Sequence, residues 1–289
     1  MSVIDVVVEK ALGSKYLETD MSKTIYVIGD SFSAGAELED HTFNSFHKFN
    51  PKNNKEYHKW ITSRDYQIEL ESRKDYDKYE SELKRAWPAK LSSLANVNVI
   101  NHSFGGSGPA MWRAKVFLDL LNFKKDNIKV DSAIIQISEY TRDCIFDTLP
   151  NGARTTYNNI GIQKLLNGSS LEKAYLKLRL KLEPEYGYFF RFLLDLASIK
   201  TSLLNFGITE IEIISHNSSI LNDWKNLEFI NNPDIQSLLT YLGIDLDLPI
   251  TAIWENYIPG KFPPILPNSH YPESMHDEFA KRMKSKLNL

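Results

Sequence analysis

Four short apolar runs, rich in isoleucine and valine, are spaced along the chain with helical patterns between them. They lack clear polar alternation, which is typical of strands covered on both faces. Because strands and helices alternate, the pattern predicts a central, mostly parallel sheet between two helical layers, a three-layer α/β/α sandwich. The predicted strands are Thr24 to Ile28, Val97 to Asn101, Ser132 to Ile137 and Ile211 to Ser215, with Ile250 to Trp254 as a fifth candidate.

Two longer stretches interrupt this alternation and predict helical insertions on one domain. The first, residues 41–85, is rich in charged residues and tyrosine, and its second half, from residue 65 onward, predicts one solvated helix. The second, residues 147–206, holds two helical patterns, Leu171 to Leu182 and Tyr188 to Leu204. Pro184 separates them, because proline disrupts a helix interior. We expect both insertions to lie at the mouth of the sheet.

The two ends of the chain carry further patterns. Apolar side chains recur every four positions from Met275 to Leu287, which predicts an amphipathic terminal helix. Met21-Ser22-Lys23 resembles a second chain start. We therefore expect an extension, residues 1–22, and a single domain, residues 23–289, that carries the insertions.

Composition excludes several functional classes. A chain of 289 residues, 42% hydrophobic and 25% charged, is typical of a globular protein with a sizeable core. A formal net charge of −3 and a pI near 6.2 argue against nucleic acid as a partner, because phosphate binding requires a basic face. The single cysteine, Cys144, excludes an intrachain disulfide and a four-cysteine zinc site.

We expect no membrane partner, because the apolar runs are too short. None approaches the roughly 20 residues of a membrane span. The first ten residues lack the basic start of a signal peptide and carry acidic residues within their apolar stretch. We therefore expect synthesis in the cytoplasm without export by a signal peptide.

A turn of small residues, Gly29 to Gly35, directly follows the first predicted strand. Open α/β sheets bind ligands at this carboxyl edge. If a helix starts near Ser33, its free N–H groups favour negative charge near Ser31, and a serine there can act as a nucleophile beside a base. The alternative, which the spacing alone favours, is that Asp30 and Ser31 only cap the helix.

Two further clusters contain candidate functional residues. One follows the second predicted strand, and the other lies at the start of the last helix. Asn101 to Pro109 contains three glycines, which let the backbone approach a ligand and aim N–H groups at an oxyanion; an ordinary turn is the alternative. His270 and His276 flank the start of the last helix, and a loop histidine, with a free pKa of about 6.5, can act as a general base. Two histidines six positions apart are weak grounds for a metal, so we expect none.

Together the three clusters resemble the sequence blocks of the SGNH, or GDSL, hydrolase family. Gly29 to Gly35 is similar to the first block, whose serine is the nucleophile, and Asn101 to Gly106 is similar to the second. His270-Tyr271-Pro272 resembles the last block, whose histidine is the base. Trp87-Pro88-Ala89-Lys90-Leu91 resembles a Trp-Pro-x-x-Leu element that often precedes strand two. Outside the insertions, the resemblance extends from Lys23 to Leu289 and implies a flavodoxin-like fold.

The resemblance implies a serine esterase that needs no cofactor and no metal. Ser31 would attack the ester carbonyl and His270 would accept its proton, while the N–H groups of Ser31 and Gly106 stabilise the oxyanion. The expected substrate is a small-molecule or carbohydrate ester, with removal of an acyl group such as acetate.

One departure from the family pattern concerns the third catalytic member. Asn268 occupies the place of the family's aspartate, and asparagine can orient an imidazole but supplies no negative charge. A Ser–His dyad and a carboxylate from elsewhere remain open, with Asp245, Asp247 and Glu273 as candidates.

A second departure concerns the family's third block, which has an asparagine that donates to the oxyanion. Here the corresponding stretch offers Tyr140, Thr141 or Arg142, each of which can donate a hydrogen bond. The replacement is similar to variants among phage-encoded members. The rival hypothesis is therefore a non-catalytic protein of the same fold, such as a virion component or a homo-oligomeric assembly module, and acyl transfer is a further alternative.

Overall fold

The computed structural model describes residues 23–36, 38, 40, 43–52, 54–73, 78–104, 107–137, 140, 143–148, 155–160, 170–182, 185–215, 219–246 and 271–289. Its centre is a parallel sheet in the order β2-β1-β3-β6. Tyr26 of β1 pairs with Ile100 of β2 on one side and with Ala133 of β3 on the other. The strands are β1 (Thr24–Ile28), β2 (Asn98–Asn101), β3 (Ser132–Gln136) and β6 (Glu210–Ile214).

This strand order confirms the predicted fold class. The four strands run 2-1-3-4 in chain order, which is the flavodoxin-like arrangement of a doubly wound sheet. Each observed strand lies within one residue of its predicted bounds at either end, because buried parallel strands consist of continuous apolar runs. The fifth candidate strand, Ile250 to Trp254, lies outside the described residues.

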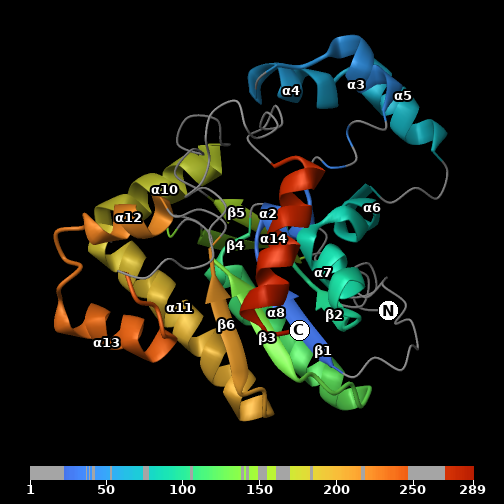
Figure 1. The fold of residues 1–289 in the computed structure, drawn as a ribbon. Coiled ribbons are helices and arrows are strands. Elements are labelled where there is room, and N and C mark those ends of the chain that lie inside the picture. Colours follow the sequence, from blue (N-terminus) through green and yellow to red (C-terminus); the bar gives the residue numbers. More distant parts are fainter. Residues whose placement is uncertain are drawn as a thin grey trace.

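Helices cover both faces of the sheet (Figure 1). One apolar core joins β1 and β3 to helices that include α8 (Pro109–Lys125), α11 (Glu185–Phe206) and α13 (Pro233–Leu242). A second core, on the opposite face, joins the sheet to α7 (Trp87–Ala95) and α14 (Glu273–Lys286). The sandwich therefore has three layers.

The segment expected as the second insertion contains one helix of the sandwich itself. α11 buries Phe189, Leu196 and Ile199 in the first core, and the chain continues from α11 into β6. Before it come α10 (Ser170–Leu182) and an antiparallel hairpin that the apolar pattern did not predict, β4 (Asp143–Thr148) with β5 (Thr155–Ile160). The predicted division of the chain into an extension and a domain with insertions stays a prediction, since residues 1–22 lie outside the described residues.

The first insertion differs from its prediction in one respect. Residues 65–85 do not form one helix, because the first helical run stops at Arg73, whose ψ of 74° is not helical. Two helices result, and α3, α4 and α5 lie beyond the carboxyl edge of the sheet (Figure 1). The helices are α3 (Asn44–Phe49), α4 (Asn54–Ile61), α5 (Arg64–Ser72) and α6 (Lys78–Arg85).

Helices α3, α4 and α5 have a small aromatic core of their own. Trp60 is fully buried there, and its ring contacts Phe46 and Tyr66 with centroids 4.9 and 4.8 Å apart. The indole N–H of Trp60 donates to Ser45 Oγ over 3.2 Å. Trp60 is therefore a packing residue of this unit. Trp224 is likewise buried, in the first core of the sandwich.

Candidate active site

The turn after β1 places Ser31 at the carboxyl edge of the sheet, as the first residue of the short helix α2 (Ser31–Ala34). The carbonyl of Asp30 accepts from the backbone N–H of Ala34 over 3.0 Å, and one carboxylate oxygen of Asp30 accepts from the backbone N–H of Phe32 over 3.0 Å. Asp30 thus caps the turn. The Ser31 side chain lies outside what the structure describes.

Gln136, the last residue of β3, holds this turn from beneath. Its side-chain amide donates to the same Asp30 oxygen over 2.7 Å, and its amide oxygen accepts from the Ser33 hydroxyl. All three side chains are buried. Gln136 could not be singled out from the sequence, because one glutamine at the end of an apolar strand belongs to no motif.

The loop after β2 lies against the same turn. Asn101 donates from its side chain to the carbonyl of Ser33 over 2.8 Å. The Ser107 hydroxyl and the backbone N–H of Phe104 donate to the carbonyl of Gly29 over 3.0 and 3.1 Å. The first two predicted clusters are therefore adjacent. Gly106, the expected oxyanion donor, lies outside the described residues.

The flank of the third cluster also reaches the turn. Phe32 contacts Tyr271 edge to face, with ring centroids 5.0 Å apart, and His276 at 4.5 Å. His276 is buried, and its Nδ1 accepts from the backbone N–H of Trp87 over 3.0 Å. Asn268 and His270 themselves lie outside the described residues, so their assignment as catalytic residues stays a prediction.

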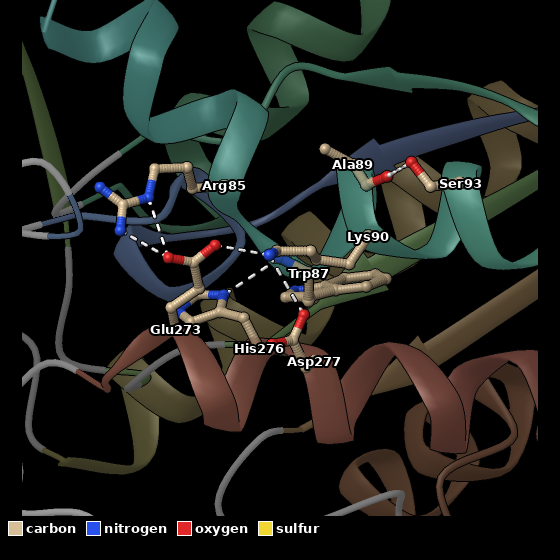
Figure 2. Close-up of polar contacts among 8 residues, drawn as sticks. All are labelled: Arg85, Trp87, Ala89, Lys90, Ser93, Glu273, His276 and Asp277. Atoms are coloured by element: carbon tan, nitrogen blue, oxygen red, sulfur yellow. Dashed lines mark hydrogen bonds and ion pairs between the residues drawn. The ribbon is translucent and has the colours of Figure 1, made fainter.

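Glu273, one candidate for the missing carboxylate, is held by two cations in this structure (Figure 2). One oxygen accepts from Arg85 Nε over 3.0 Å, and the other accepts from Lys90 Nζ over 2.5 Å. Partial burial alone would raise the pKa of Glu273, but these hydrogen bonds outweigh it and lower the pKa. Of the other two candidates, Asp245 lines a surface hollow beside α13, and Asp247 lies outside the described residues.

Tyr140, one of the three candidates for the second oxyanion donor, is hydrogen-bonded to a carboxylate. Its hydroxyl donates to Glu185 at the start of α11, and its ring contacts Phe189 edge to face at 5.4 Å. Burial and then this hydrogen bond raise the pKa of Tyr140. The hydroxyl proton is thus already used. Thr141 and Arg142 lie outside the described residues.

An aspartate–histidine pair that the sequence analysis missed lies below the loop after β2. His102 Nδ1 lies 2.8 Å from Asp119 Oδ2, which also accepts from the Tyr26 hydroxyl over 2.6 Å. Burial opposes ionisation of Asp119, but the hydrogen bond with His102 and the charge of Lys115 outweigh it and lower the pKa of Asp119. Because the His102 ring packs against Tyr26 and Phe123, the pair belongs to the core beneath α8.

The described residues show neither a metal site nor a membrane-spanning helix. No three metal-ligating side chains gather there in a way that could hold an ion. The described helices include none that is both long and apolar enough to span a membrane. Two surface hollows, between α3 and α5 and beside α13, include no residue of the turn after β1.

Comparison with known proteins gives only distant similarity. No family model and no curated protein matches the chain. One similar solved structure is a G-D-S-L family protein from Desulfitobacterium hafniense, assigned as lipolytic; identity is 11%, the TM-score is 0.44, and the match covers 91% of this chain and 99% of that one.

A second similar structure is an acetyl xylan esterase from the rumen bacterium Butyrivibrio proteoclasticus. Identity is 12%, the TM-score is 0.43, and the match covers 93% of this chain and 65% of that one, so this chain spans under two thirds of that structure. At these scores neither likeness carries weight for function, and the fold rests on the chain's own sheet topology.

Proposed function

We propose that this protein is a serine esterase of the SGNH type, with Ser31 as the nucleophile and His270 as the base. One observation carries the proposal. Phe32, the residue after Ser31, is in ring contact with Tyr271, the residue after His270, although the two lie at opposite ends of the described chain. Consecutive Cα atoms are about 3.8 Å apart, so this contact supports a site in which Ser31 and His270 act together.

The chemistry follows from these two side chains. Ser31 Oγ attacks the carbonyl carbon of the ester while the His270 imidazole takes the hydroxyl proton. The negative oxygen of the tetrahedral intermediate is stabilised by the N–H groups of Ser31 and Gly106. The C–O bond to the alcohol then breaks, and His270 returns the proton to the departing alcohol. Water attacks the acyl-enzyme by the same steps and releases the acid.

We propose a dyad in which Asn268 orients the imidazole. Glu273 is already hydrogen-bonded to Arg85 and Lys90 through both oxygens, which makes it a poor partner for His270. We also propose that the substrate carries its acyl group, such as acetate, on a carbohydrate. The helices α3 to α5 lie beyond the carboxyl edge, where they can contact a substrate larger than the reacting ester (Figure 1).

The test is covalent labelling with a fluorophosphonate probe, which reacts only with an activated serine. We expect wild type to be labelled, Ser31→Ala to show no labelling and His270→Ala to be labelled far more slowly. Ser93→Ala is the matched control, since the Ser93 hydroxyl is exposed and donates to the carbonyl of Ala89 on α7 (Figure 2). Wild type that resists the probe, or labelling that persists in Ser31→Ala, contradicts the proposal.

A non-catalytic module of the same fold, such as a virion or assembly component, is the second candidate. One observation favours it. The Tyr140 hydroxyl donates to Glu185, so its proton is not available to an oxyanion at the carboxyl edge of the sheet. The same labelling experiment separates the two candidates, because a module has no activated serine.

A further inference from the structure

Trp87 is hydrogen-bonded to both segments that carry the proposed catalytic residues. Its indole N–H donates to Ser33 Oγ over 3.0 Å, two residues after Ser31. Its backbone N–H donates to His276 Nδ1 over 3.0 Å, six residues after His270 (Figure 2). Trp87 is fully buried, so water does not compete for either bond.

The bonds on the serine side form a directed chain. The Ser33 hydroxyl accepts from Trp87 and donates to Gln136, and the Gln136 amide donates in turn to Asp30. Because Ser33 and Gln136 each accept one of these hydrogen bonds and donate the next, the orientation of each side chain depends on its neighbours. Trp87 thereby fixes the hydroxyl of Ser33, and through it the turn on which Ser31 lies.

The bonds on the histidine side hold the first turns of α14. Since His276 Nδ1 accepts a hydrogen bond from the backbone N–H of Trp87, Nδ1 carries no proton in this arrangement and the ring proton lies on Nε2. On the same side of α14, Glu273 binds Arg85 and Lys90, and Asp277 lies 3.2 Å from Lys90 (Figure 2). The start of α14 is therefore tied to α6 and α7 by one buried hydrogen bond and several ion pairs.

We propose that Ser33, Trp87 and His276 are positioning residues that set the separation of Ser31 and His270. This inference rests on the proposed esterase function. None of the three side chains is required to touch the substrate. Their effect comes through distance, because proton transfer from a nucleophile to its base requires hydrogen-bond geometry and a misplacement of about 1 Å can cost about 100-fold in rate.

The test compares variants of similar size. His276→Leu removes the acceptor, whereas His276→Asn keeps an acceptor near the place of Nδ1, and Ser33→Ala removes the linking hydroxyl. We expect His276→Leu and Ser33→Ala each to lower kcat for p-nitrophenyl acetate by about 10- to 100-fold at unchanged KM. His276→Asn should recover most of that loss, and Ser93→Ala should match wild type.

A double-variant cycle tests whether both sides act through Trp87. Because the two bonds share one residue, Ser33→Ala combined with His276→Leu should lose less activity than the product of the two single losses. Rates are compared well below the unfolding temperature of each variant. Multiplicative losses, a fall in kcat of His276→Asn as large as that of His276→Leu, or losses that appear only in KM would overturn the proposal.

Variants in the buried network can fail to fold, so a half-exposed residue provides an independent test. Glu273→Gln weakens the tie between α14 and α6–α7 without changing the buried bonds, and we expect a smaller loss of kcat at unchanged KM. Unchanged kcat overturns the positioning role. Wild type that neither labels nor hydrolyses the ester instead overturns the proposed function and this inference with it, so the two failures are distinguishable.

Discussion

Phe32 and Tyr271 meet edge to face, with ring centroids 5.0 Å apart and ring planes at 79°. Phe279 of α14 packs on Phe32 in the same way at 5.2 Å. Such aromatic pairs contribute about 0.5–1.5 kcal/mol each beyond the area that they bury. Aromatic contacts with Phe32 therefore help to hold the C-terminal segment against the turn after β1.

Truncating that ring should destabilise the protein and separate the two segments. We expect Phe32→Ala to lower the free energy of unfolding by about 3–5 kcal/mol, the usual cost of deleting a buried phenylalanine. Phe117→Ala, at an exposed position on α8, should change it by less than about 0.5 kcal/mol. Urea unfolding followed by circular dichroism measures both. Equal losses in the two variants would mean that Phe32 is not a packing centre.

Gly35 ends α2 with a positive φ of 75° and lies close to α6. A Cβ there would lie 2.5 Å from the carbonyl oxygen of Glu82, whereas a Cβ at Gly243, with a φ of 76°, meets nothing within 4 Å. Gly243→Ala should therefore cost only the left-handed strain of about 1–2 kcal/mol. Gly35→Ala should cost about 1–3 kcal/mol more, because the clash is added. Similar urea midpoints for the two variants would contradict the close approach.

Glu273 should contribute to stability in a pH-dependent way. Its pKa is lowered in the folded state, so its contribution is fully present above its unfolded value of about 4.5 and is lost as the pH falls through the lower folded value. Glu273→Gln should thus destabilise at pH 7, with a deficit that is smaller at pH 3. Free energies of unfolding at both pH values test this.

The control for this pH effect is Glu80→Gln, which removes an exposed pair with Lys84 on one helix. Such pairs contribute only about 0.3–0.5 kcal/mol, so the variant should follow wild type closely at both pH values. A Glu273→Gln deficit that is the same at pH 3 and pH 7 would show that packing, not charge, is lost.

Asn268→Asp should raise the rate of ester hydrolysis if Asn268 orients the imidazole. An aspartate beside His270 would stabilise the imidazolium that forms during attack, and loss of that group in a serine protease lowers turnover about 10⁴-fold. Steady-state turnover of p-nitrophenyl acetate by wild type and variant checks the expectation. A fast wild type whose rate does not change in the variant would place another residue beside the histidine.

The four strands of the parallel sheet, the helices α10, α11 and α14 and the order of the three candidate clusters were predictable from sequence alone. β1 is a run of apolar residues followed at once by Gly29, Asp30 and Ser31, and both features are local. Apolar runs identify buried strands because solvent is excluded from both faces, and parallel strands bring their carboxyl ends to one edge. That is why Ser31 and Asn101 could be expected at the same edge before the structure was known.

The tertiary structure decided which side chains hold this edge together. Gln136 belongs to no local pattern, and the motifs that contain Trp87 and His276 do not indicate what these residues bind. The hydrogen bonds of all three join segments that are distant in the chain. The same holds for Glu273, which was a candidate for the carboxylate beside His270 and which the fold places between Arg85 and Lys90. Periodicity reports which residues are buried, but a buried polar group takes its partner from whatever the packing of the layers brings beside it.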